Sequence, residues 1–178
     1  MKPQSALASG PFIKKVSPMI VRSSLQTPLG PMTLAASSDG LCGAWFEQQK
    51  HHPDVSAWPL ADPRHERLRQ ASHQLIEYFR GMRQHFDLEL DLSAGTAFQR
   101  EVWRSLLDIP FGGRRSYGQL AEHSGHPGAA RAVGAAVGRN PISIVVPCHR
   151  VLGAGGSLTG YAGGVERKAA LLELESQA

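Results

Sequence analysis

The sequence predicts an α+β protein, with a small sheet-plus-helix half followed by a mostly helical half. Short apolar stretches separated by turn residues fill residues 19–47, which is the pattern of strands. A helical spacing of apolar residues follows over 63–82, and two helix-capping sequences occur after residue 93. With 178 residues, of which 42% are hydrophobic and 19% charged, the chain can bury a substantial core.

Three strands are predicted in the first half, over residues 20–25, 32–36 and 41–46. Residues 27–31, with two prolines and a glycine, form a turn by composition between the first two strands. Asp39-Gly40 marks a tight hairpin before the third strand. The predicted strands therefore follow one another closely along the chain.

A single helix is predicted over residues 63–82, after a loop at 48–62. Its apolar face holds Leu68, Leu75, Ile76 and Phe79. Residues 86–92 then alternate apolar and acidic side chains, which predicts an edge strand, and Ser93-Ala94-Gly95 is a linker.

Three helices are predicted in the second half. Thr96 and Gln99 form a capping box that opens the first helix, and Ile109-Pro110 ends it. A second capping box, Ser116 and Gln119, opens a short helix that runs to about His123. After a glycine-containing turn at 124–128, the third helix covers 129–138, which gives a helix-turn-helix arrangement.

The third helix carries almost no large side chains. Apart from two valines and Arg131 it consists of alanine and glycine, and Gly134 within it costs about 1 kcal/mol relative to Ala. One interpretation is close packing against another helix. The other is that DNA approaches the helix backbone closely, with one arginine entering the base stack, as minor-groove proteins do with inserted side chains.

Charge and cysteine content restrict the environment of the protein. The net charge is +4, and residues 100–150 hold seven arginines against three acids, which permits contacts with phosphates. Cys42 and Cys148 form no disulfide framework, and no apolar run reaches the roughly 20 residues that span a membrane. We expect a cytoplasmic protein without membrane contact, and a flexible tail rather than a signal peptide over residues 1–18.

A metal site is not expected. His51, His52 and His65 are interpreted as solvated loop histidines, because adjacent histidines without a third ligand at fixed spacing are weak evidence for metal binding.

The most informative segment is the heptad Val145–Val151, in which Cys148 lies between Pro147 and His149. A thiolate is a strong nucleophile, and a neighbouring imidazole or guanidinium, here His149 or Arg150, lowers the pKa of a thiol. The alternative is an inert buried cysteine. Polar flanking residues beside a proline are unusual in a core strand, so they favour the reactive cysteine.

Residues 96–175 resemble the O6-alkylguanine-DNA alkyltransferases, also called methylated-DNA–protein-cysteine methyltransferases. The matching sequences include Arg131-Ala132-Val133-Gly134, Pro147-Cys148-His149-Arg150-Val151 and Gly160-Tyr161-Ala162-Gly163-Gly164. The resemblance implies a ribonuclease H-like domain at 19–92 and a winged-helix-like domain for DNA binding and alkyl transfer at 93–178. It also implies irreversible, single-turnover transfer of an alkyl group to Cys148 without a cofactor. Some relatives bind a structural zinc in the first domain through cysteines and histidines, but only Cys42 is available here, so no such site is expected.

The resemblance assigns catalytic roles to five residues. Cys148 accepts the alkyl group, His149 acts as its base through a water molecule, and Glu175 orients His149. Helical spacing supports Glu175 over Glu173, because Glu175 shares a face with Lys168 and Leu172. The other two are Tyr117, which helps protonate the leaving guanine, and Asn140, which braces the turn before the active-site segment.

The remaining residues assigned by resemblance bind DNA or form the base pocket. Arg131 fills the gap left by the flipped nucleotide, and the small residues Ala129, Ala130, Gly134 and Ala135 face the DNA together with Tyr117. The base pocket comprises Val151, Tyr161, Ala162, Lys168 and Ser143. Position 162 is Ala where some relatives carry Ser. Because the family's contact to O6 there is attributed to the backbone N–H, we expect little loss of activity. The implied partner is double-stranded DNA containing O6-alkylguanine, and possible substrates include O4-alkylthymine; the DNA is bound mainly through the minor groove by a monomer.

Two other functions compete with this interpretation. A DNA-lesion binder or transcription regulator would use the same helix-turn-helix, but binding-only relatives lack the cysteine that is present here as Cys148. A Cys-His hydrolase would turn over and would not need a helix of small residues.

Overall fold

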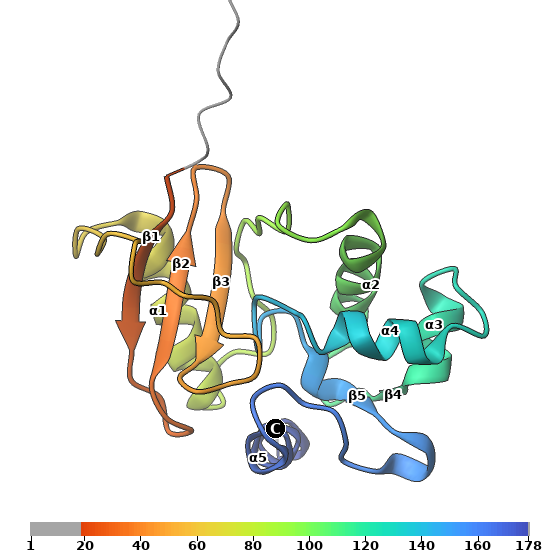
Figure 1. The fold of residues 1–178 in the computed structure, drawn as a ribbon. Coiled ribbons are helices and arrows are strands. Elements are labelled where there is room, and N and C mark those ends of the chain that lie inside the picture. The colour runs from red at the N-terminus through yellow and green to blue at the C-terminus, as the bar shows by residue number, and fades with distance from the viewer. Residues whose placement is uncertain (1–18, 178) are drawn as a thin grey trace, which may run out of the picture.

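The computed structural model describes residues 19–177, so the tail expected over 1–18 lies outside the described residues. The order of elements is a strand-rich part with one helix, followed by a part dominated by helices (Figure 1). The predicted α+β class is therefore confirmed. None of the helices over 19–177 is long and apolar enough to cross a membrane.

The first part contains an antiparallel sheet in the order β1-β2-β3. The strands are β1 (Val21–Leu25), β2 (Met32–Ala36) and β3 (Leu41–Phe46), so all three predicted strands are confirmed. In the first turn the Thr27 hydroxyl accepts a hydrogen bond from the Leu29 N–H and donates one to the Gly30 carbonyl. Gly30 has φ 108°, a conformation that other residues rarely adopt.

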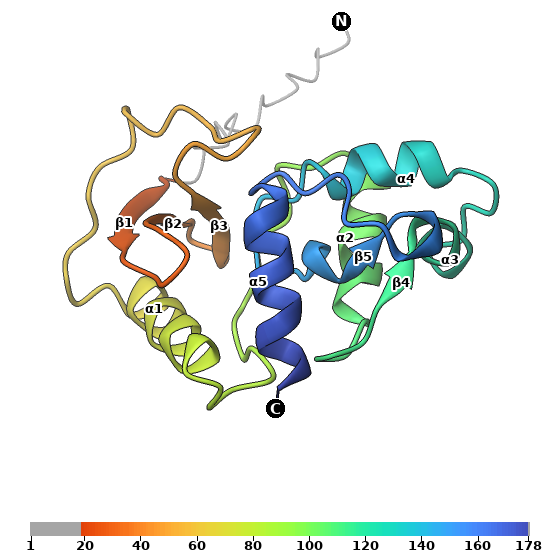
Figure 2. The ribbon, with the colours of Figure 1, turned by 90° about the horizontal axis from the view of Figure 1, so that it is seen from below.

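Helix α1 (Glu66–Phe79) packs against the sheet and contacts all three strands (Figure 2). His65 caps its first turn, so the helix is shorter than the predicted 63–82. Its buried face is Leu68, Ala71, Leu75 and Tyr78, at spacings of three and four. The expected place of Ile76 on this face is wrong, because Ile76 lies about 100° around the helix from Leu75 and is 36% exposed.

The edge strand predicted at 86–92 is also wrong. This segment makes a single bridge, between Leu90 and Leu41. The reason is that the Gln74 side chain on α1 takes both backbone groups of Asp87: its amide donates to the Asp87 carbonyl at 2.9 Å and its oxygen accepts from the Asp87 N–H at 2.8 Å. The segment is therefore tied to the helix at Asp87 and meets the sheet only at Leu41, whose N–H donates to the Glu89 carbonyl and whose carbonyl accepts from the Asp91 N–H.

The second part contains four helices and a short parallel strand pair. The helices are α2 (Ala97–Leu107), α3 (Tyr117–His123), α4 (Ala130–Val137) and α5 (Val165–Ser176), and the strands are β4 (Arg115–Ser116) and β5 (Val151–Leu152). Both capping boxes predicted from the sequence are present, at the starts of α2 and α3. All three predicted helices of this half are therefore confirmed.

The small residues of α4 have a packing role on one of its faces. Val133, Ala136 and Val137 are buried, and the Trp103 indole of α2 donates a hydrogen bond to the Ala136 carbonyl at 2.8 Å. The indole reaches the α4 backbone because the side chains there are short. Close packing therefore accounts for the buried face, whereas Arg131 and Ala135 on the other face are exposed.

The two parts are joined through β3 and α5. The Ala44 N–H of β3 donates to the Pro141 carbonyl at 2.9 Å, and the Ser143 N–H donates to the Ala44 carbonyl at 2.8 Å. Helix α5 lies between the sheet domain and the other helices (Figure 2), and Arg167 on it donates to the Leu29 carbonyl at 2.9 Å. The segment that leads to Cys148 is thus held by the first domain.

Candidate active site

Cys148 begins a single 3₁₀ turn, η1 (Cys148–Arg150), that follows Pro147. Four residues before the cysteine, Ile144 has φ 73°, a left-handed conformation that is strained for a β-branched residue. Such strain is concentrated at functional sites, where the surrounding structure holds it in place. The turn also removes the strand alternation that would have pointed Cys148 and His149 to opposite faces.

The Cys148 thiol is enclosed, with 5% of the residue exposed. The Asn140 side-chain amide donates to the Cys148 sulfur at 3.0 Å and to the Val146 carbonyl at 2.8 Å. Burial raises the pKa of the Cys148 thiol, and the Asn140 hydrogen bond and the charge of Lys168 lower it only in part. The resting thiol is therefore protonated, and the sulfur needs a base before it can act as a nucleophile.

His149 is fully buried and is oriented by Glu175. Its Nε2 lies 2.7 Å from Glu175 Oε1, while its Nδ1 is buried without a hydrogen-bond partner within residues 19–177. Burial lowers the pKa of His149, and the hydrogen bond to Glu175 opposes this only in part. A neutral imidazole that donates from Nε2 leaves a lone pair on Nδ1, so His149 can accept a proton.

The Glu175 carboxylate accepts hydrogen bonds from four donor groups besides His149. Arg150 Nε donates to Oε2 and its Nη2 to Oε1, both at 2.9 Å. The Tyr78 hydroxyl donates to Oε1 at 2.8 Å, and the Gly112 N–H donates to Oε2 at 3.2 Å. Burial alone would raise the pKa of Glu175, but the hydrogen bonds from His149 and Arg150 lower it to about 2.

The Arg150 guanidinium contacts Glu175 rather than the Cys148 thiol. Its guanidinium forms a bidentate ion pair with Glu175 and donates its remaining Nη1 to the Ile109 carbonyl. It therefore neutralises the carboxylate that orients His149. The sequence showed the charge of Arg150 but contained no signal for its partner.

The wall of the predicted base pocket is tied together at the Thr159 carbonyl. This oxygen accepts from the Tyr117 hydroxyl at 3.2 Å and from Lys168 Nζ at 3.0 Å. Lys168 also donates to the Val151 carbonyl, and both residues are buried. The Tyr161 hydroxyl is buried without a partner in the described chain, which leaves a polar group available near the cysteine.

The other two predicted pocket residues contact the first domain. The Ala162 carbonyl accepts from the Lys50 N–H at 2.9 Å. Ser143 is 2% exposed, and its hydroxyl donates to the Gln49 side chain at 3.2 Å. Sequence reasoning missed Gln49, which also accepts from the Phe46 N–H at 2.9 Å.

The residues predicted to bind DNA lie on α4 and at its N-cap Ala129, except Tyr117, which begins α3. Ala129, Ala130 and Gly134 are half-buried, whereas Arg131 and Ala135 are exposed. A side chain added at Gly134 would lie 3.4 Å from the Tyr117 ring, so this small residue brings α4 close to Tyr117. A groove of about 400 Å³ runs from α4 to the pocket wall and is lined by Lys50, His51, Gly134, Ala135, Gly138, Arg139, Gly160, Tyr161 and Ala162.

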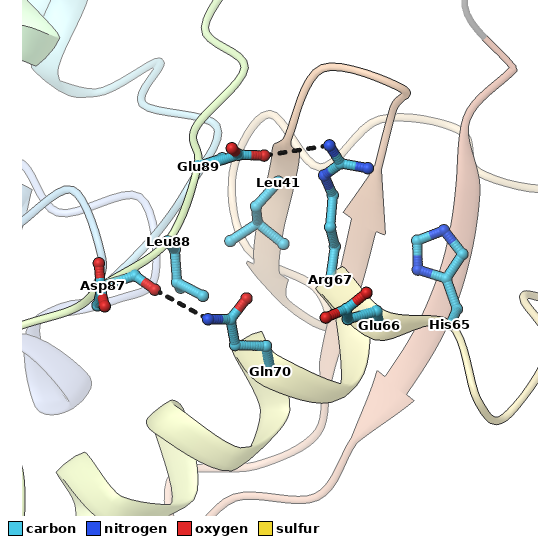
Figure 3. Close-up of a pocket in the computed structure, with 8 residues that line it drawn as sticks. All are labelled: Leu41, His65, Glu66, Arg67, Gln70, Asp87, Leu88 and Glu89. Atoms are coloured by element: carbon cyan, nitrogen blue, oxygen red, sulfur yellow. Dashed lines mark hydrogen bonds and ion pairs between the residues drawn. The ribbon is translucent and has the colours of Figure 1, made fainter.

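A separate pocket of about 480 Å³ lies in the first domain, beside the start of α1 (Figure 3). In it Arg67 forms an ion pair with Glu89 at 3.1 Å, and the Gln70 amide donates to the Asp87 carbonyl at 3.2 Å. None of the residues that line it belongs to the site around Cys148. Its contacts instead anchor residues 87–89 to α1.

Two family models match the chain on either side of residue 93. The model described as 6-O-methylguanine DNA methyltransferase, ribonuclease-like domain matches residues 20–92. The model described as 6-O-methylguanine DNA methyltransferase, DNA binding domain matches residues 97–177. The chain belongs to the 6-O-methylguanine DNA methyltransferase family.

Individual members of this methyltransferase family are similar over most of their length. A methylated-DNA–protein-cysteine methyltransferase of Mycobacterium tuberculosis is 51% identical over 157 residues, which cover 88% of this chain and 93% of the relative. One from Methanosarcina acetivorans is 46% identical and covers 84% and 94%. A crystal structure of Mycobacterium tuberculosis OGT in complex with DNA matches with a TM-score of 0.82 at 50% identity, over 88% and 93% of the chains.

Proposed function

We propose that this methyltransferase repairs DNA by transferring an alkyl group from O6 of guanine to Cys148, once per molecule. The observation that carries the proposal is the enclosed thiol beside a neutral His149, whose orientation is fixed by Glu175. Family membership supports the reaction type. The named relatives are methylated-DNA–protein-cysteine methyltransferases, and one structural neighbour was crystallised with DNA.

The reaction is a displacement at the alkyl carbon. Nδ1 of His149 accepts the thiol proton, through a water molecule as in the family; the sulfur forms a bond to the alkyl carbon, and the carbon–oxygen bond breaks. The guanine leaves with a proton delivered through the Tyr117 hydroxyl, so that the net change exchanges a proton and an alkyl group between sulfur and base. Since the protein is itself the acceptor, the reaction consumes no cofactor.

DNA binding is assigned to the helix-turn-helix of α3 and α4. The exposed face of α4 has small side chains, so a DNA minor groove can approach its backbone, and Arg131 is free to enter the base stack. The flipped base would then enter the groove beside Tyr161. The residues proposed to contact the DNA are Arg131, Ala129, Ala130, Gly134, Ala135 and Tyr117.

The organisation of the chain is proposed as in the family. A ribonuclease H-like domain covers residues 19–92 and an alkyl-transfer domain covers 93–178. We propose that the protein acts as a monomer in the cytoplasm on duplex DNA that contains O6-alkylguanine.

The test is to incubate the protein with a duplex containing O6-methylguanine and to measure intact and peptide masses. We expect one methyl group per protein, on the peptide with Cys148. Cys148→Ala should still bind the duplex and accept nothing. Cys42→Ala is the matched control and should transfer normally, because the Cys42 thiol lies outside the site, where burial raises its pKa to about 11.

Three outcomes would contradict the proposal. Repair of several lesions per protein molecule would indicate a hydrolase with turnover. Tight binding of the lesion with neither protein nor DNA altered would indicate a binding protein. A methyl group found on Cys148→Ala would place the acceptor elsewhere.

A further inference from the structure

Tyr78 connects the sheet domain directly to the reaction centre. It lies on α1, 97 positions from Glu175 in the chain, and its hydroxyl donates to Glu175 Oε1 at 2.8 Å. The residue is completely buried. The same carboxylate oxygen lies 2.7 Å from His149 Nε2, so Tyr78 and His149 share one acceptor.

We propose that Tyr78 is a positioning residue for alkyl transfer: its hydroxyl fixes the orientation and charge of Glu175 and thereby sets the strength of His149 as a base. The inference rests on the proposed function, because it assigns His149 the role of the base for Cys148. It gives the ribonuclease-like domain a part in the chemistry, since that domain supplies the hydroxyl.

The Tyr78 ring is held in place by other aromatic side chains. Phe79 and Phe86 have ring centroids 5.5 Å from it, and the Phe111 centroid lies at 6.1 Å. Burial raises the pKa of Tyr78, and the charge of Glu175 raises it further, so the phenol keeps its proton and remains a donor. A donor in a fixed position imposes a fixed position on its acceptor.

The effect on His149 follows from the charge on Oε1. Each donor to this oxygen withdraws negative charge from it, and without Tyr78 the remaining donors are His149 and Arg150. Glu175 would then stabilise a protonated His149 more strongly. The groups that face the pair are Arg150 and Cys148 on η1, Lys168 on α5, the Gly112 N–H on Oε2, and Tyr161 near Tyr78.

The experiment compares Tyr78→Phe with the wild-type protein in single-turnover transfer from duplex O6-methylguanine across pH. Because the protonated fraction of His149 increases, the acidic limb of the rate profile should move to higher pH. On that limb we expect transfer to be slower by about tenfold, the size of one lost hydrogen bond to a charged group. At high pH the two rates should converge.

A second readout does not depend on methyl transfer. The ¹⁵N signals of the His149 imidazole, assigned by their loss in His149→Asn, should titrate at higher pH in Tyr78→Phe. The matched control is Leu68→Ala, at the other end of the buried face of α1, which removes core packing but keeps Tyr78 and its aromatic neighbours, and should lower thermal stability without moving either pH curve.

The outcomes distinguish a failure of the proposed function from a failure of the role proposed for Tyr78. If wild-type protein accepts no methyl group, the proposed function fails, whatever the histidine titration shows. If the wild type transfers normally, and Tyr78→Phe has the wild-type rate profile and the wild-type His149 titration, Tyr78 is a packing residue only. A rate lowered equally at every pH would overturn the inference as well.

Discussion

The reaction centre and the exposed face of α4 are built in opposite ways. At the centre, the Arg150 guanidinium donates to Glu175 and to the Ile109 carbonyl. Glu175 is also bonded by His149 of the same turn and by two other parts of the chain, at Tyr78 and Gly112. On α4, the exposed side chain of Arg131 makes no hydrogen bond or ion pair within residues 19–177. One region is saturated with internal contacts, and the other is left open.

The difference shows what positions the side chains of each region. The centre holds buried charges, and a buried charge is tolerated only when it is paired and hydrogen-bonded, so each member depends on the others. The exposed face of α4 needs only small side chains and one long cationic side chain, because the DNA supplies the remaining contacts. Substitutions at the centre should therefore affect stability and chemistry together, and those on α4 should affect only encounters with DNA.

The largest effect is expected from Glu175→Gln. This change preserves size but leaves the buried Arg150 without a counter-charge, which should cost about 3 to 5 kcal/mol of unfolding free energy. Alkyl transfer should also slow strongly, because His149 loses the acceptor that orients it. The matched control is Glu173→Gln, two residues away on the exposed face of α5, and it should change neither quantity.

The same variant should alter how stability depends on pH. The pKa of Glu175 is about 2 in the folded protein, below its ordinary value of 4.5, so its contribution is complete above 4.5 and is lost as pH falls toward 2. His149, whose pKa is lowered by burial, adds a loss that begins near 6.5. Denaturant unfolding between pH 7 and 3 should show the steeper decline at acidic pH for the wild type, and an unchanged decline in Glu175→Gln would contradict the assignment.

Local signals in the sequence were sufficient for much of the fold. The two capping boxes and the turn at 27–31 specify their elements through residues that are close in the chain, and the structure contains them. The edge strand at 86–92 failed because the Gln74 side chain on α1 takes both backbone groups of Asp87, so that pairing with β3 is confined to Leu41. Periodicity likewise did not distinguish Ile76 from Tyr78, whose burial is settled by contacts across the domain interface.

The site could be predicted to the extent that its residues share a helix or a short segment. Lys168 and Glu175 share a buried face of α5, which helical spacing was enough to indicate. Arg150 and Tyr78 converge on Glu175 from 25 and 97 positions away, and no spacing in the sequence encodes that meeting. The raised pKa of the Cys148 thiol similarly depends on burial, which the flanking residues do not reveal.

An intermediate effect is expected from Arg131→Ala, which tests the exposed face of α4. Because Arg131 is exposed and unbonded in the described chain, stability should change by no more than about 0.5 kcal/mol. Repair of duplex O6-methylguanine should slow by about tenfold or more, since base flipping costs a few kcal/mol that an inserted side chain offsets. Transfer from free O6-benzylguanine base should be unaffected.

The control for Arg131→Ala is Arg104→Ala, which removes the same charge from an exposed position on α2. It should weaken duplex repair much less, because general attraction to phosphates is shared among many cations. Equal losses on duplex and free base would mean that Arg131 acts on the reaction centre, and the proposed separation between the two regions would fail.

The smallest effect is expected from Ala162→Ser, at the boundary between the two regions. The hydrogen bond that ties Ala162 to the first domain is made by its backbone carbonyl, which accepts from the Lys50 N–H, and a serine hydroxyl leaves that bond intact. Duplex repair rates should therefore change by less than about twofold, within the range of a neutral surface substitution. Gly160→Ala is the contrasting variant, because Gly160 has φ 75° and an added Cβ would lie 2.8 Å from the Tyr117 hydroxyl. That variant should slow repair clearly, whereas a loss in Ala162→Ser as large as in Gly160→Ala would show that the side chain at 162, and not its backbone, contacts the alkylated base.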